Sequence, residues 1–149
     1  TSGKLYASGQ AGERFAVRNS GSFAVVEGCG AHGCEYMTGG TAIILGQVGD
    51  NFGAGMTGGM AFVYDENNDF ENFANPSSII WQPVETDFWK NFLKESIIDF
   101  ENKTYSQKAK KILDNFDTEL KKFKQVCPIE MLDKLDNPIS LKPHIKRAG

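Results

Sequence analysis

Short apolar segments recur at a fixed interval in the first part of the chain. Three of them start 19 residues apart, namely Phe23–Val26, Ala42–Leu45 and Ala61–Tyr64. An interval of 19 residues is too short for a helical hairpin repeat, which takes about 33 residues or more. It suits one coil of a parallel β-helix, in which equivalent strands stack and their apolar side chains form continuous internal rows. The pattern therefore predicts a solenoid.

Glycines follow the same interval. Gly40 lies 19 residues after Gly21 and 19 before Gly59, and Gly30 lies 19 before Gly49. Glycine tolerates positive φ and close backbone approach, and tight corners between short strands require one or the other. We therefore predict that these five glycines are structural corner residues. Because each coil buries its apolar side only against its neighbours, such a solenoid needs several coils and covered ends.

The repeat is no longer recognisable after Tyr64, and Asp65–Asp69 is predicted to form a polar turn. Residues 77–82 are predicted to form a last strand, which ends at Pro83. Beyond this point, large apolar residues between 89 and 100 have helical spacing with charged residues between them. The period thus changes from that of a solenoid to that of a helix.

A second helical stripe runs from Ala109 to Phe123, with Ser106 or Thr104 as its candidate N-cap. We expect this helix to continue to about Val126, since Pro128 would then stop it. The sequence therefore predicts a mainly β chain with a C-terminal α-helical segment.

We divide the chain into two parts on this basis. Residues 1–83 are expected to form a β-helix with coils of about 18–19 residues. Residues 84–149 are expected to form a helical segment and tail that pack on the solenoid. Within this second part, we predict a short third helix at residues 129–135 and an extended or frayed tail at residues 137–149.

Composition narrows the range of functions. The formal net charge is only -3, so no basic surplus points to nucleic acid. No apolar run approaches the roughly 20 residues of a membrane helix. The chain has 3 cysteines, an odd number that does not make a disulfide framework. Reduced thiols favour a cytoplasmic location.

Three long runs resemble one known family. Gly12–Gly21, Val26–Gly40 and Asn51–Gly59 closely resemble the C-terminal glycine-repeat (GXGXG) β-helix domain of glutamate synthase large (alpha) subunits. Gly46–Gly53 also fits the G-x-x-G-x-x-x-G spacing of that domain. The resemblance extends more weakly over the helical half, so it covers nearly the whole chain.

The resemblance implies a right-handed parallel β-helix with a structural, scaffolding role. In the family, an amidotransferase domain releases ammonia from glutamine, and a flavin and iron–sulfur domain reduces 2-iminoglutarate to glutamate. None of the catalytic or cofactor motifs of those domains matches here. We therefore assign no catalytic and no cofactor-binding residue, and expect FMN and an iron–sulfur cluster elsewhere in the parent oxidoreductase. The expected partners are the remaining domains of the large subunit and the small subunit.

Two departures from the family pattern stand out. Ala31 occupies a position where the family usually has an acidic residue. The family's β-helix also has further coils before the position of Thr1, so we expect the chain to begin within the solenoid. An uncovered first coil would leave strand edges unpaired, and we expect missing chain, a partner or self-association with another copy to cover it.

One cluster has the residue types of a metal site. Cys29, His32 and Cys34 form a C-x-x-H-x-C pattern, and Cys127 could supply a fourth ligand. Thiolate and imidazole suit zinc, but the spacing is not that of a finger or ribbon. We therefore assign no metal ligand and keep the three residues as weak candidates. Cys34 and His32 would also share a face as a nucleophile pair, yet no orienting Asn or Asp is evident.

A glycine motif offers another alternative. Gly28-x-Gly30-x-x-Gly33 has the form of a dinucleotide fingerprint and follows an apolar strand. Such a site needs a helix N-terminus for the pyrophosphate. No helical pattern follows, and the next copy of the repeat arrives instead. The motif is therefore expected to be part of the solenoid.

Two other classes of function stay open beside the scaffold. The first is a stand-alone β-helix assembly subunit of an oxidoreductase, of the kind that occurs in formylmethanofuran dehydrogenase. The second is a metal-binding module at Cys29, His32 and Cys34. The donor of a glutamate synthase, whether NADPH, NADH or ferredoxin, has no determinant in this sequence.

Overall fold

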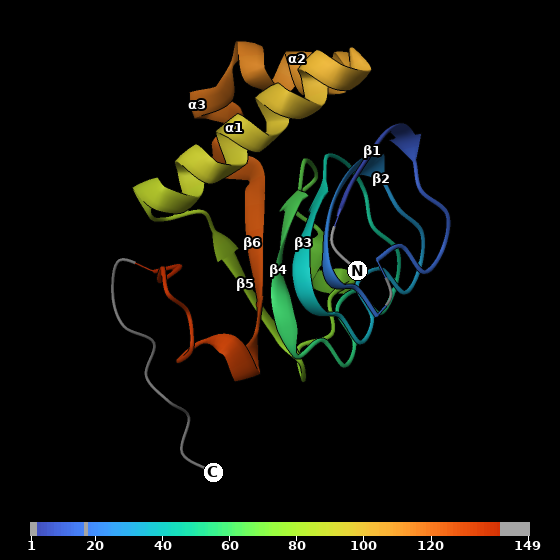
Figure 1. Ribbon diagram of the computed structural model, residues 1–149, viewed down its shortest axis with the longest axis vertical. Coiled ribbons are helices and arrows are strands. Elements are labelled where there is room, and N and C mark those ends of the chain that lie inside the picture. The colour runs from blue at the N-terminus through green and yellow to red at the C-terminus, as the bar shows by residue number, and fades with distance from the viewer. Residues whose placement is uncertain (1–2, 17, 141–149) are drawn as a thin grey trace.

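The computed structural model describes residues 3–16 and 18–140. One six-stranded sheet runs through it in the order β1-β2-β3-β4-β6-β5 (Figure 1). Its first four strands are parallel and their connecting loops make a β-solenoid of about three turns, which confirms the predicted fold class. These strands are β1 (Gly3–Gln10), β2 (Ser20–Gly28), β3 (Thr38–Ile44) and β4 (Gly58–Tyr64).

The register between the coils differs from the simple interval of the sequence. Val25 pairs with Ile43 and Ile43 pairs with Phe62, which are steps of 18 and 19 residues. The predicted alignment of Phe23–Val26 on Ala42–Leu45 was therefore wrong by one residue. The interval changes at one irregularity in each pair of strands: it falls from 19 to 18 residues between Ser20 and Phe23, and from 20 to 19 between Thr38 and Thr41.

The loop of each coil uses a repeated backbone pattern. Three residues at every second position have left-handed φ values between 54° and 75°. Main-chain hydrogen bonds to the coils on either side hold them, such as Arg14 N–H to Ala31 O and His32 N–H to Asp50 O, both 2.8 Å. Most of these residues are not glycine, which the sequence did not indicate. The three sets are Arg14, Ala16 and Arg18; His32, Cys34 and Tyr36; and Asn51, Gly53 and Gly55.

Alternate residues of the strands enter two separate cores. One face points into the solenoid, where Ala24, Ala42 and Ala61 join Phe52 and other loop residues. The opposite face lies under the helices. Its strand residues include Val25, Ile43 and Phe62. The central strands β2, β3 and β4 are thus buried on both sides where they are apolar, whereas β1 at the edge is largely exposed and polar.

Three helices cover the outer face of the sheet. They are α1 (Asp87–Thr104), α2 (Gln107–Asp114) and α3 (Phe116–Glu119), and Figure 1 shows them grouped on one side of the molecule. The predicted helix around residues 89–100 is confirmed as α1. Ser106 is the N-cap of α2, since its Oγ accepts a hydrogen bond of 3.2 Å from Ala109 N–H. None of the described helices is long and apolar enough to cross a bilayer.

The prediction of one helix from Ala109 to Val126 was wrong. The chain instead forms α2, α3, a 3-10 turn η2 (Leu120–Lys122) and then β6 (Phe123–Pro128). β6 inserts between β4 and β5 (Ile79–Pro83) and pairs antiparallel with both. Tertiary pairing therefore overrides the helical spacing of this segment.

The remaining predictions for the second part had mixed outcomes. The strand expected at 77–82 is present as β5. The expected helix at 129–135 is only a 3-10 turn, η3 (Ile129–Met131). The expected tail at 137–149 is described as far as Ser140, and residues 141–149 lie outside the described part of the chain.

The end of the solenoid beyond β4 is covered. Asp65 Oδ1 accepts hydrogen bonds from Asp69 and Phe70 N–H at 2.9 and 3.1 Å, and these start the 3-10 turn η1 (Phe70–Asn72). The Phe70 ring then lies 5.4 Å from Phe52 and 5.7 Å from Trp81, between centroids. At the opposite end of the sheet, β1 is an edge strand whose Leu5 side chain is 56% exposed.

Candidate functional site

The two cysteines of the metal candidate lie inside the solenoid. Cys29 and Cys34 are both buried, and burial raises the pKa of the Cys29 thiol to about 12. Burial, with a smaller contribution from Cys29, also raises the pKa of Cys34. Thiols in this state are neutral and poor metal ligands or nucleophiles. His32 is more exposed, and its Nδ1 is paired with the Glu35 carboxylate.

Cys127 does not join them. It lies in β6 and packs in the core under the helices, on the opposite face of the sheet from Cys29 and Cys34. The idea of Cys127 as a fourth ligand was therefore wrong. Over residues 3–16 and 18–140, no three His, Cys, Asp or Glu side chains are grouped as a metal ion would require.

The same geometry tests the cofactors that the resemblance implied. An iron–sulfur cluster is held by thiolates, usually four. The chain has 3 cysteines, and the sheet separates Cys127 from the other two. The residues of this chain therefore do not fit an iron–sulfur cluster.

The dinucleotide motif lies in a loop without a helix. Gly28 ends β2, residues 31–36 form consecutive turns, and β3 follows at Thr38. A side chain at Gly33 would meet the Phe52 ring at 3.0 Å and the Cys29 sulfur at 3.1 Å. This space is filled by core atoms, so no phosphate can approach the glycine as a nucleotide fold requires.

The predicted corner glycines occupy two kinds of position. Gly40 and Gly59 have positive φ values of 84° and 85° at the starts of β3 and β4. Gly49 has no left-handed conformation but stacks tightly, because a Cβ there would lie 2.4 Å from Ala31 N. At Gly30 the nearest atom would be Glu13 Cγ, at 3.2 Å. Gly21 lies near the start of β2 and is exposed.

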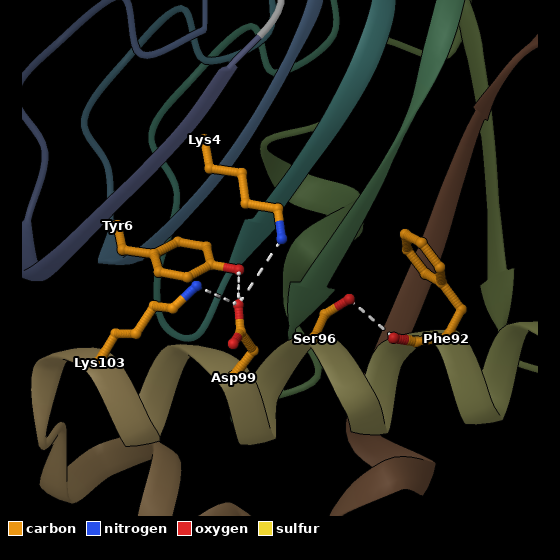
Figure 2. A network of polar contacts seen from close by, with 6 residues as sticks. All are labelled: Lys4, Tyr6, Phe92, Ser96, Asp99 and Lys103. Carbon is orange, nitrogen blue, oxygen red and sulfur yellow. Dashed lines mark hydrogen bonds and ion pairs between the residues drawn. The ribbon is translucent and has the colours of Figure 1, made fainter.

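Three polar links fasten the helices to the solenoid. The first joins β1 to α1, as Figure 2 shows. Tyr6 O–H donates to the Asp99 carboxylate at 2.6 Å, and Lys103 and Lys4 approach the same oxygen at 3.2 and 3.8 Å. The hydrogen bonds from Tyr6 and Lys103 lower the pKa of Asp99. Desolvation and the Asp99 carboxylate raise the pKa of Tyr6.

The other two links use the same chemistry further along the sheet. Ser106, the N-cap of α2, donates its hydroxyl to the Glu27 carboxylate at the end of β2. Tyr64 in β4 donates to Glu119, which also pairs with Lys122 at 3.0 Å. The hydrogen bond from Tyr64 lowers the pKa of Glu119. Each link therefore joins a carboxylate to a hydroxyl across the solenoid and the helical segment.

Sequence reasoning missed all three links. The partners are 93, 79 and 55 residues apart in the chain. Neither the solenoid interval nor the helical period relates positions at such separations. Only the capping role of Ser106 was predicted, as one of two candidates beside Thr104, because capping is a local signal.

These features define a class of protein, a parallel β-solenoid of tightly stacked coils whose charged groups fasten a helical cover. The chain belongs to the GXGXG motif family, whose model matches residues 1–129. This confirms the family that the three glycine-rich runs indicated.

Several curated relatives are similar over most of this chain. The Azospirillum brasilense protein "Glutamate synthase [NADPH] large chain" is 55% identical over 141 residues, covering 95% of this chain and 9% of the relative. "Ferredoxin-dependent glutamate synthase" of Antithamnion sp. is 52% identical, covering 86% and 8%. "Glutamate synthase [NADH]" of Schizosaccharomyces pombe is 47% identical, covering 99% and 7%. The chain thus spans less than a tenth of the length of these relatives.

Proposed function

We propose that this chain is a structural domain of a glutamate synthase and carries no catalytic residue of its own. The observation behind the proposal is its identity of 47–55% to short segments of three glutamate synthases. These matches favour a glutamate synthase over an assembly subunit of the formylmethanofuran dehydrogenase type. The parent enzyme would be an oxidoreductase that makes glutamate from glutamine and 2-oxoglutarate.

The build of the solenoid supports a bracing role. Its interior is filled by side chains, with Phe52 and Met37 fully buried. The thiols that resembled a metal site lie in this core, and the carboxylates Glu27, Asp99 and Glu119 are engaged with hydroxyl groups. A closely packed solenoid of this kind resists deformation, because its strands, its coils and the helices are in contact with one another.

We assign the solenoid to residues 1–83 and the segment that packs on it to residues 84–149. The structural glycines in this assignment are Gly21, Gly30, Gly40, Gly49 and Gly59. Relatives named for NADPH, NADH and ferredoxin all share the segment. We infer that the choice of electron donor, and the sites for FMN and the iron–sulfur cluster, belong to other parts of the parent enzyme.

The partners in this proposal are the other domains of the large subunit. The edge of β1 is the place where they would add to the solenoid, since Leu5 and the outer edge of that strand are exposed. A cytoplasmic location follows from the three thiols, which would be kept reduced there.

An assay of the purified chain tests the proposal. With glutamine, 2-oxoglutarate and a reductant, the chain alone should form no glutamate, and after incubation with FMN, iron and sulfide it should retain neither flavin nor iron. Circular dichroism on the same sample must show that the protein is folded. Glutamate formation by the folded chain, or stoichiometric retention of flavin, would overturn the proposal.

A further inference from the structure

A hollow lies where α2, α3 and the end of β4 meet. Its volume is about 360 Å³, which is within the range of small-molecule sites. It is open to solvent on one side and lies beside the Tyr64–Glu119 link. The polar and charged side chains that the inference uses are Tyr64, Glu66, Lys108, Lys111, Glu119 and Lys122.

The charge around this hollow differs in sign from that of the whole molecule. The chain has a formal net charge of -3. Residues 103–124, in contrast, contain seven lysines and only three acidic residues. Because three of those lysines line one hollow, their positive potentials add in a partly enclosed space rather than being spread over the surface.

The acidic residues of the hollow leave two of its lysines without a carboxylate. Glu119 is occupied by Tyr64 O–H and by Lys122, whose Nζ is 3.0 Å away. Lys108 Nζ lies 5.8 Å from the centroid of the Tyr64 ring. The ion pairs found among the described residues involve Lys4, His32, Lys103 and Lys122, but neither Lys108 nor Lys111.

We propose that this hollow binds a small anion with two or more negative charges, held mainly by the ammonium groups of Lys108 and Lys111. A phosphate or a polycarboxylate has this chemistry, and flexible lysine side chains can converge on either. Glu66 is the opposing charge, since it lines the same hollow. Because the site is open, binding is weak and falls as ionic strength rises.

Isothermal titration with inorganic phosphate and, separately, with citrate tests the site at low ionic strength. The Lys108→Gln/Lys111→Gln double variant should raise the Kd about tenfold, the combined effect of two exposed ion pairs. The matched control is Lys110→Gln/Lys121→Gln, which removes the same charge from two exposed lysines that do not line the hollow. Its Kd should stay within about twofold of the original value.

Glu66→Gln provides a test of opposite sign, because removing the opposing charge should tighten anion binding by about two- to threefold. Thermal melts of all variants check that the fold is intact. Binding of only one of the two anions would support the site and would show whether its ligand is a phosphate or a polycarboxylate. Equal weakening in both double variants, or no binding of either anion by the original chain, would overturn the proposal.

Discussion

The solenoid and its helical cover hold together by different means. In the solenoid, main-chain groups of one coil bond directly to the next, as Tyr36 N–H does to Ala54 O at 2.9 Å. The cover instead contacts the sheet through side chains. Rings from α1 meet rings from the strands, with Phe100 at 5.6 Å from Tyr6 and Phe92 at 5.9 Å from Phe62.

This difference determines which sequence changes each region tolerates. Main-chain stacking leaves no room for a Cβ at some positions, so the solenoid depends on the absence of side chains. The helical cover depends on their presence, since each large buried side chain contributes about 1.5–3 kcal/mol. The contrast shows that the residues of a glycine-rich run can tolerate substitution as little as those of an aromatic core.

The largest effect is expected from Gly58→Ala, which tests the stacking of β4 on β3. A Cβ at Gly58 would lie 2.0 Å from Thr38 O, a main-chain atom that cannot turn aside. The variant should lose about 3 kcal/mol of unfolding free energy or fail to fold. Urea denaturation followed by circular dichroism measures the change.

Gly12→Ala is the matched control for this substitution. A Cβ at Gly12 would meet nothing within 4 Å, so its unfolding free energy should stay within about 0.5 kcal/mol of the original. If both variants lose the same stability, glycine content rather than stacking would be responsible, and the contrast between the regions would fail.

An intermediate effect is expected in thiol labelling, which compares the opening of the two cores. Cys127 lies under the cover and Cys34 inside the solenoid. Opening the cover breaks mainly side-chain contacts, with few main-chain bonds such as Asp65 N–H to Lys122 O at 2.9 Å, whereas opening the solenoid breaks the repeated main-chain bonds between coils. Alkylation in mild urea should therefore modify Cys127 about tenfold faster than Cys34, as mass spectrometry of the peptides would measure.

The pH dependence of labelling adds a check. Burial raises the pKa of Cys127 to about 12, so the thiol is neutral and shielded in the folded protein. Labelling through opening should instead follow the ordinary thiol pKa of about 8.5 and level off above it, because the opened core exposes the thiol to water. Faster labelling of Cys34 than of Cys127 would show that the solenoid opens first, contrary to the comparison.

The smallest effect is expected from Asp99→Asn, which weakens the link between β1 and α1. The folded state lowers the pKa of Asp99. The carboxylate therefore stabilises the fold fully above its ordinary pKa of about 4 and loses this contribution as pH falls through the lower, folded value. The urea midpoint of the original chain should fall more than that of the variant between about pH 5 and pH 2.

Glu95→Gln is a control on the same helix, because Glu95 is exposed and lies outside the Tyr6 link. Its midpoint should follow that of the original chain at every pH. A pH profile for Asp99→Asn that coincides with the original would mean that the link adds no stability.

The sequence determined the solenoid by itself, together with α1 and the strand at residues 79–83. Periodicity is a local property of the sequence. A 19-residue interval predicts a solenoid coil, and a helical stripe predicts a helix, without knowledge of distant contacts. The family could also be identified from the sequence, because its characteristic residues lie in contiguous runs such as Val26–Gly40.

Tertiary structure decided what no local pattern contains. Phe123–Pro128 forms a strand rather than the predicted helix, since pairing with β4 and β5 on its two sides outweighs a weak helical propensity. Tertiary structure shifted the register by one residue between β2 and β3, which kept the alanine rows inside. It also joined Tyr6 to Asp99 and gathered Lys108, Lys111 and Lys122 around one hollow, because contacts between distant segments exist only once the chain has folded.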